Sequence, residues 1–135
     1  MEKIIWNENL SVGVTEIDRQ HKQLVSILNQ LLGMDGLTVD SETISDTLTR
    51  MTNYADYHFN SEEGLMQKYA YHDYASHRLE HVAFMRKTAE LAMGTMVYKK
   101  TVPTDLLDYL KTWLIEHILV SDMKYKQFFQ EKGVN

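Results

Sequence analysis

The stretch between residues 58 and 81 carries two pairs of side chains of the types that bind metal ions in proteins. His58 is followed four residues later by Glu62, and His77 is followed four residues later by His81. Residues four apart on an α-helix differ by about 40° around the helix axis, so each pair projects from one helical face. Two such helices can therefore aim four metal-ligating side chains at one point.

Candidate ligands also occur near both ends of the chain. His21 lies three residues after Asp18, and His117 lies five residues before Asp122. The full candidate set comprises five histidines and two carboxylates: His21, His58, His77, His81, His117, Glu62 and Asp122. One metal ion does not need seven protein ligands, whereas two iron-type ions that share bridging carboxylates do.

The alternative interpretation is a set of ordinary buried polar residues. A single histidine on an apolar helix face is usually a hydrogen-bonded core residue. An apolar core offers few partners for five imidazoles and two carboxylates, and burying an unpaired ionised carboxylate costs several kcal/mol. Two divalent cations would supply charge and coordination to all seven groups, so the complete set favours a metal site.

Two further polar residues near these ligands fall outside the set. His72 lies in a predicted turn, off the period that joins His77 to His81, and we expect it at the surface. Glu63 is about 100° from Glu62 around the helix, which directs it toward solvent or a helix interface.

The spacing between His117 and Asp122 conflicts with a regular α-helix. Residues five apart are about 140° apart around the axis, so both side chains reach one centre only if the backbone departs from α geometry. We therefore predict a π-type or broken turn near Val120 and Ser121.

Length and composition exclude several classes of protein and site. A chain of 135 residues fits a single domain, so we expect residues 1–135 to form one unit. The chain has no cysteine, which excludes disulfides, thiolate-ligated zinc, iron–sulfur clusters and cysteine nucleophiles.

The net charge is −5 and the basic residues are scattered, so nucleic acid is not an expected partner. No apolar run approaches the ~20 residues that span a bilayer, and with no signal-peptide pattern we expect a cytoplasmic protein.

Hydrophobic periodicity predicts an all-α protein. Residues 1–14 lack a sustained helical period and predict an extended arm laid over the core and anchored by Trp6. Helices are expected from Thr15 or Asp18 to about 33, from Asp40–Ser41 to beyond 65, from about 74 to 96, and from Thr104 through 121 with a helical tail to 132. Thr15-Glu-Ile-Asp18 resembles a capping box at the first helix. Amphipathic helices joined by short loops predict an antiparallel up-down-up-down four-helix bundle.

These motifs together resemble the hemerythrin family. Asp18-x-x-His21, His58-x-x-x-Glu62, His77-x-x-x-His81 and His117-x-x-x-x-Asp122 occur in this order on four predicted helices. The chain length is similar to that of the bacterial branch. The opening Trp6, Val12-Gly13-Val14 and Ile17-Asp18-x-Gln20-His21 are also similar to that branch's N-terminal arm.

The resemblance implies a specific division of ligands between two iron ions. One iron would take three imidazoles, from His77, His81 and His117. The other would take two imidazoles, from His21 and His58. Glu62 and Asp122 would bridge both ions, with an oxo or hydroxo group as the third bridge. This leaves one vacancy beside the two-imidazole iron, where O2 would bind, and we expect pocket walls from Leu24, Leu114 and Ile118.

The function implied is reversible O2 binding for transport, storage or delivery, and not catalysis. We expect a monomer that passes O2 to an O2-consuming recipient protein. Carboxylate-rich di-iron oxygenases and ferritins use Glu-x-x-His motifs, and this chain has none. Two alternatives remain: an enzyme that handles peroxide, nitric oxide or iron, and a sensor that passes O2 binding to a partner. Zinc, manganese or cobalt would also suit these ligands.

Overall fold

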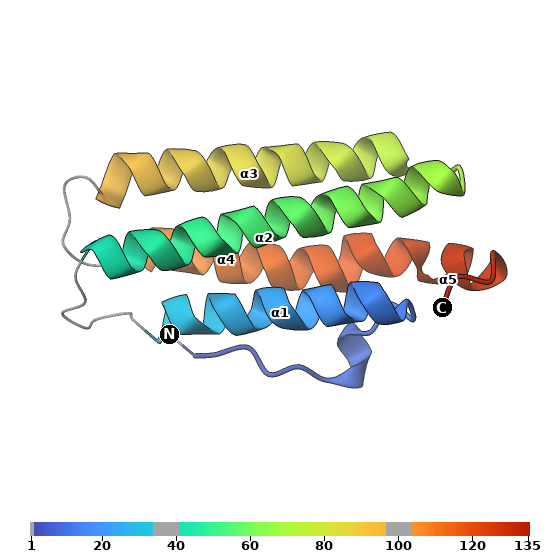
Figure 1. Cartoon of the computed structure of the whole chain (residues 1–135), viewed down its shortest axis with the longest axis horizontal. Helices are drawn as coiled ribbons and strands as arrows, with labels where there is room; N and C mark the ends of the chain where they lie inside the picture. Colours follow the sequence, from blue (N-terminus) through green and yellow to red (C-terminus); the bar gives the residue numbers. More distant parts are fainter. Residues whose placement is uncertain (1, 34–40, 97–103) are drawn as a thin grey trace.

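The computed structural model describes residues 2–33, 41–96 and 104–135, and the regular structure in these ranges is helical (Figure 1). After a short 3-10 helix, η1, come four long helices, a π-helical turn, η2, and a short terminal helix. Their bounds are η1 Glu8–Leu10, α1 Thr15–Leu32, α2 Ser41–Lys68, α3 Tyr74–Met96, α4 Thr104–Glu116, η2 His117–Asp122 and α5 Met123–Glu131.

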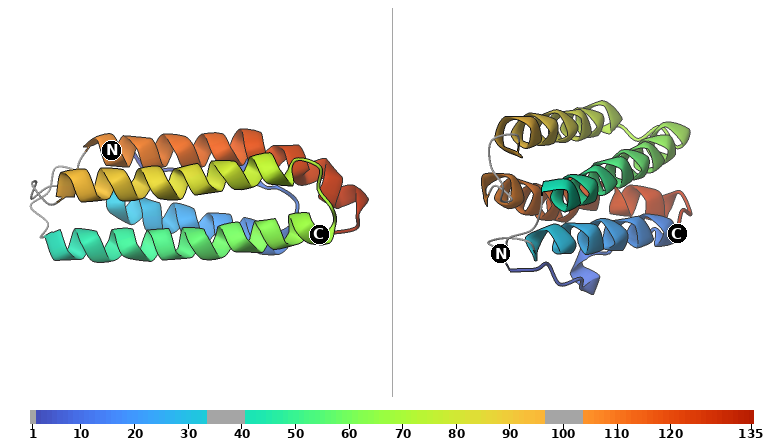
Figure 2. Two further views of the ribbon diagram at one scale, coloured as in Figure 1. Left: turned by 90° about the horizontal axis from the view of Figure 1, so that it is seen from above. Right: turned by 60° about the vertical axis from the view of Figure 1, so that its left-hand side comes forward.

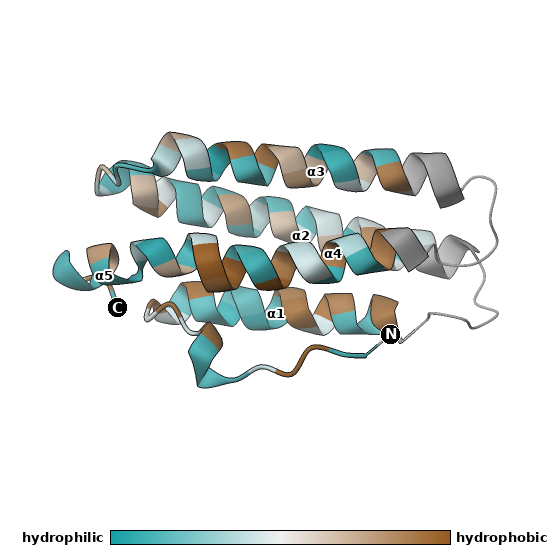
Figure 3. Cartoon of the chain, turned by 180° about the vertical axis from the view of Figure 1, so that it is seen from behind, coloured by the Kyte–Doolittle hydropathy of each residue, from teal (hydrophilic) through white to brown (hydrophobic). Residues whose placement is uncertain are grey.

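The four long helices lie side by side as an antiparallel bundle (Figures 1 and 2). Each packs against its neighbours in sequence, and α1 also contacts α4, which closes the bundle. Hydrophilic and hydrophobic residues alternate along the helical ribbons, as expected for helices with one buried face (Figure 3). The prediction of an all-α four-helix bundle is confirmed.

The start of α1 departs from the predicted capping box. Val14 is the N-cap residue and makes no side-chain cap hydrogen bond. Asp18 instead accepts hydrogen bonds from Ser11 Oγ at 2.6 Å and from the Val12 backbone N–H at 2.8 Å. The capping-box prediction is wrong because the Asp18 carboxylate holds the arm rather than the helix N–H groups. The caps predicted at Asp40–Ser41 and Thr104 lie outside the described residues and side chains.

The N-terminal arm is extended except for η1, and hydrogen bonds fasten it to the bundle. Asn29 on α1 accepts from the Ile4 backbone N–H at 2.8 Å and donates to the Ile4 carbonyl at 2.9 Å. Ile4 and Leu10 are buried, whereas Trp6 is half-buried. The arm is therefore anchored by Ile4 and Leu10 more than by Trp6.

Two apolar clusters fill the bundle interior, one on each side of a polar layer. The larger includes Leu24, Phe84 and Leu110, and the smaller includes Ile17 and Phe129. None of the seven candidate ligands belongs to either cluster. Along α1, for example, Ile17 belongs to the smaller cluster and Leu24 to the larger, with His21 between them. The fold thus isolates the polar residues in one layer between apolar walls.

Candidate metal centre

The seven candidate ligands predicted from the sequence converge in the interior of the bundle, and each is no more than 4% exposed. They form two sets whose ligand atoms lie within 4.8 Å of one another. One set comprises His77, His81, His117, Glu62 and Asp122, and the other comprises His21, His58, Glu62 and Asp122. Both carboxylates belong to both sets. His72 is exposed, as expected.

Glu62 turns one carboxylate oxygen toward each set. Its Oε1 lies 3.1 Å from His21 Nε2 and 2.9 Å from His58 Nε2. Its Oε2 lies 3.2 Å from His77 Nε2 and 3.4 Å from His81 Nε2. One residue of α2 therefore links imidazoles from three helices.

Asp122 divides its oxygens in the same way. Its Oδ2 lies 3.1 Å from His21 Nε2, while its Oδ1 lies 3.0 Å from His77 Nε2 and 3.1 Å from His117 Nε2. Within the described residues, neither oxygen receives a hydrogen bond of good geometry. A fully buried carboxylate without such donors is a site where a cation fits.

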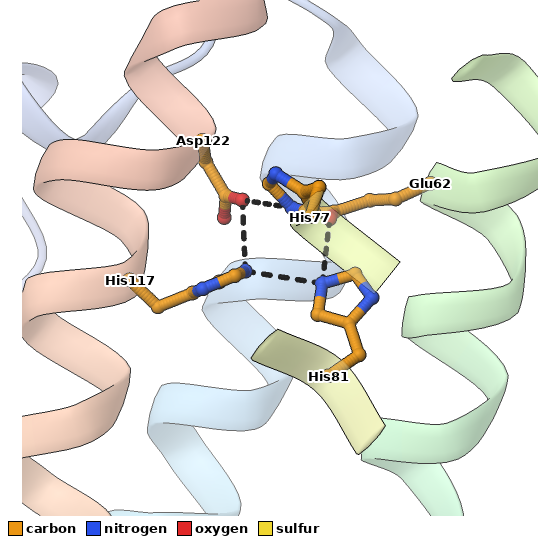
Figure 4. Close-up of side chains that lie close together, drawn as sticks. All are labelled: Glu62, His77, His81, His117 and Asp122. Carbon is orange, nitrogen blue, oxygen red and sulfur yellow. Dashed lines mark hydrogen bonds and ion pairs between the residues drawn. The ribbon is translucent and has the colours of Figure 1, made fainter. Parts of the chain in front are cut away.

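The three-imidazole set closes around a common point (Figure 4). The Nε2 atoms of His81 and His117 face each other at 3.0 Å. Metal–imidazole bonds are about 2.1 Å long. Two nitrogen atoms bound to one ion at right angles would therefore lie about 3.0 Å apart. The donor types and spacing therefore fit a metal ion held by nitrogen and oxygen ligands.

The π-helical turn η2 brings Asp122 to the site. It spans His117–Asp122, so both side chains point inward although they are five residues apart. Within this turn Leu119 and Val120 are exposed, while Ile118 and Ser121 are buried. The prediction of a π-type turn near Val120 and Ser121 is confirmed.

Two residues outside the set fix the orientation of ligand imidazoles. Gln20 Nε2 donates to Glu16 Oε1, so its Oε1 accepts from His58 Nδ1 at 2.8 Å. Glu63 Oε2 accepts from His81 Nδ1 at 2.9 Å. In both imidazoles the proton is on Nδ1, which leaves the Nε2 lone pair facing the centre.

These partners were not predicted as parts of the site. Glu63 lies at the interface of α2 and α3, one of the two positions expected for it, but its bond to His81 depends on how the two helices pack. Tyr125 on α5 is fully buried and donates its hydroxyl to Glu62 Oε1 at 3.0 Å. Tyr125 lies three residues after Asp122, so its place near the same helix face could have indicated a role at the site.

The buried carboxylates and imidazoles shift one another's pKa values. Burial lowers the pKa of His21, but its close contacts with the carboxylates of Asp122 and Glu62 raise it overall to about 9. The same balance raises the pKa of His77 to about 10. Burial lowers the pKa of His58. Although burial raises the pKa of Glu62, the neighbouring imidazoles hold it well below its usual value.

An apolar cavity adjoins the site in the larger cluster. Its lining consists of Leu24, Leu28, Met51, Ala55, Phe59, Phe84, Leu110, Trp113 and Leu114. The volume open to the centre of a water-sized sphere is about 10 Å³. On this measure a cavity of about 10–15 Å³ can hold one water molecule, so the space suits one small molecule. Leu24 and Leu114 line it, whereas Ile118, also expected in the pocket wall, is buried but does not.

Two aromatic rings of this cavity stack on ligand imidazoles. Phe59 lies parallel to His81 with ring centres 3.9 Å apart, and Trp113 lies parallel to His117 at 4.3 Å. These contacts restrict rotation of both imidazoles and shield one side of each from water.

A family model described as the hemerythrin HHE cation binding domain matches residues 12–129. The chain belongs to the hemerythrin family. The bacteriohemerythrin of Clostridium acetobutylicum is 29% identical over 125 residues, covering 90% of this chain and 97% of that protein. A hemerythrin-like protein of Naegleria gruberi is 31% identical over 121 residues, covering 90% and 89% of the two chains.

The fold is also that of a solved hemerythrin. The crystal structure of a wild-type hemerythrin is 29% identical, with a TM-score of 0.83 and coverage of 92% of this chain and 95% of that one. The hemerythrin resemblance inferred from the sequence is thus confirmed by family, relatives and fold. In the described part of the chain, every helix is too short or too polar to cross a membrane.

Proposed function

We propose that this hemerythrin holds two iron ions with its seven buried ligands. The observation that carries the proposal is the division of each carboxylate: Glu62 and Asp122 each direct one oxygen to each set of imidazoles. A carboxylate shared in this way is suited to bridging two ions. We assign His77, His81 and His117 to one position, and His21 and His58 to the other.

We further propose that O2 binds reversibly at this centre. The position of His21 and His58 has one imidazole fewer than the other. An ion held there would therefore have one coordination position left for a small ligand. Ferrous iron, when bound, would supply the electrons that O2 binding requires. Reversible binding would allow the protein to transport, store or deliver O2.

The chain's own residues would prepare the site for this role. Gln20 and Glu63 hold His58 and His81 with their Nε2 lone pairs inward. The hydroxyl of Tyr125 holds Glu62 in place. Such partners orient ligands and raise the basicity of imidazoles, and their loss commonly lowers metal affinity about 10- to 100-fold.

The adjoining cavity would keep the site dry. Its walls are aliphatic and aromatic side chains, including Leu24 and Leu114, and apolar cavities of this kind do not retain water. Reversible binding needs such exclusion, because water and protons promote irreversible oxidation. We expect O2, a small apolar molecule, to reach the centre through this space.

The test is an optical spectrum of the anaerobically reduced, iron-loaded protein before and after exposure to air, and again after argon purging. Iron analysis should give two ions per chain. Charge-transfer bands that appear in air and disappear on purging would support the proposal. A permanent ferric spectrum formed at once would contradict reversible binding and favour a redox enzyme or a sensor.

We also propose that residues 1–135 act as one domain and as a monomer. The arm is tied to α1 by Asn29 and Asp18, so it is part of the bundle rather than a separate unit. Sedimentation of the reduced protein with and without O2 tests this. An O2-dependent change in molecular mass would contradict a simple carrier and point to a sensor.

A further inference from the structure

Charged residues outside the seven ligands are distributed unevenly around the centre. Two carboxylates, Glu63 and Glu80, lie beside the three-imidazole set. The two-imidazole set is backed by the neutral amide of Gln20. The two proposed iron positions therefore differ in the charge behind their imidazoles as well as in the number of imidazoles.

Glu63 makes the closest of these charged contacts. Its Oε2 accepts the Nδ1 proton of His81 at 2.9 Å, and its side chain is only 15% exposed. Its other oxygen lies 3.7 Å from Nε of Arg78, which is 55% exposed. The carboxylate is thus directed at the imidazole from a partly buried position, and its only cation among the described ion pairs is largely in solvent.

Glu80 is near the same set but acts differently. Its Oε1 is 4.0 Å from His117 Nδ1, which is too long for a hydrogen bond, and it accepts from Ser121 Oγ at 2.7 Å. The side chain is 47% exposed, so water screens its charge. Glu80 therefore provides a second carboxylate near this set, about 1 Å further from its imidazole and without a hydrogen bond to it.

The amide behind the other set is held in a fixed orientation. Gln20 is buried, and its Nε2 donates to Glu16 Oε1 at 3.1 Å and to Ser61 Oγ at 3.3 Å. Glu16, the carboxylate that accepts from Gln20, is one hydrogen bond further from His58 and is paired with Arg19. His58 Nδ1 thus donates to a neutral acceptor.

We propose that Glu63 makes the two iron positions unequal in redox behaviour, by favouring the ferric state at the position that binds His81. This inference rests on the proposed di-iron function. An anion that accepts the Nδ1 proton of an imidazole makes Nε2 a stronger donor, and a stronger donor stabilises Fe(III) relative to Fe(II). With two ferrous ions bound, an outer-sphere oxidant such as ferricyanide would take one electron and be reduced to ferrocyanide, and the ion that His77, His81 and His117 would hold is the one from which we expect that electron to come.

The experiment compares the first one-electron potential of iron-loaded wild type and the Glu63→Gln variant in a mediated titration. Glutamine can still accept from His81, so the substitution removes the charge and keeps the hydrogen bond. We expect the equilibrium constant for oxidation to fall about tenfold, equivalent to a rise in potential of about 59 mV for one electron. Mössbauer spectra of the half-oxidised protein should show that the Fe(III) is less strongly localised.

Two further variants separate this effect from general electrostatics. Glu80→Gln removes a nearby carboxylate that does not bond an imidazole, and should change the constant by less than about threefold. Arg78→Gln removes the cation beside Glu63 and should lower the potential, opposite in sign to Glu63→Gln. Arg78 is 55% exposed, so water screens its charge and this fall should be small. If circular dichroism shows that Glu63→Gln does not fold, Glu63→Asp takes its place: it shortens the side chain and weakens the hydrogen bond from His81, so the potential should again rise.

An unchanged potential in Glu63→Gln, or equal shifts in Glu63→Gln and Glu80→Gln, overturns the proposal. If Glu63→Gln does not fold, a Glu63→Asp potential equal to that of wild type overturns it. Failure of the proposed di-iron function would be seen in the wild type itself, which would then bind fewer than two irons per chain or show no reversible O2 spectrum. Failure of the Glu63 proposal would leave both of these wild-type results intact.

Discussion

His21 and His77 are the two imidazoles with described contacts to both Glu62 and Asp122. Their pKa values are raised to about 9 and about 10, so without a metal both carry a proton at neutral pH and balance the charges of Glu62 and Asp122. A metal ion needs the neutral imidazole. Proton and metal therefore compete for the same nitrogen atoms.

We expect loading of the centre at pH 7 to release about two protons per chain, one from each of these histidines. Affinity should fall as the pH is lowered, because the proton competes more strongly below the raised pKa values. Calorimetric titration with Zn2+ or Fe2+ in buffers of different ionisation enthalpy measures the number. Heats that do not depend on the buffer would contradict this prediction.

The cavity walls lead to a second prediction at the same scale. Replacing Leu24 or Leu114 by alanine enlarges the cavity beside the site and admits water, so autoxidation of the air-exposed iron-loaded protein should be faster by about tenfold or more. Ile118→Val is the matched control, since this buried residue does not line the cavity. Equal autoxidation rates in all three variants and the wild type would remove the cavity from the mechanism.

At the scale of the elements, Asn29 joins α1 to the arm through two hydrogen bonds to Ile4. Asn29→Ala removes both and leaves backbone groups of the arm without a protein partner, so we expect a loss of about 1–3 kcal/mol in unfolding free energy. Urea unfolding measures the loss, and faster hydrogen exchange at Ile4 would assign it to the arm. Gln30→Ala on the same helix, whose partner Arg50 is exposed, is the control and should have a smaller effect.

The helices, and the side chains that converge as candidate ligands, were predictable from the sequence, because helical period and residue spacing are local properties. The spacing of His117 and Asp122 alone was enough to predict the turn η2. Contacts that depend on how helices pack were not predictable in this way. The bond from Glu63 to His81 joins α2 and α3, and Asp18 left its expected capping role because the arm offered donors at Ser11 and Val12.

At the scale of the whole molecule, the polar layer separates two apolar clusters and receives candidate ligands from α1, α2, α3 and η2. At this layer the helices are therefore held together by charged and polar groups rather than by apolar contacts. Metal binding at this layer should stabilise the folded state as a whole, because the unfolded chain cannot assemble the site.

This coupling depends on pH in a defined direction. The raised pKa values of His21 and His77 contribute stability to the metal-free protein that is fully present below about pH 6.5, and it is lost as the pH rises through 9 to 10. Metal-free protein should therefore be less stable at pH 10 than at pH 6 in urea unfolding. Loaded protein should not show this alkaline loss, and an equal loss in both forms would contradict the linkage.

The stacking of Trp113 on His117 gives the protein an internal fluorophore at the centre. The indole lies 4.3 Å from the imidazole and nearly parallel to it. The chain has one other tryptophan, Trp6 in the arm, so a Trp6→Phe variant emits from Trp113 alone. Paramagnetic iron at His117 should quench this emission strongly, whereas Zn2+ should not. Filling of the three-imidazole position can thus be followed in real time, without a label, by the light the protein itself emits.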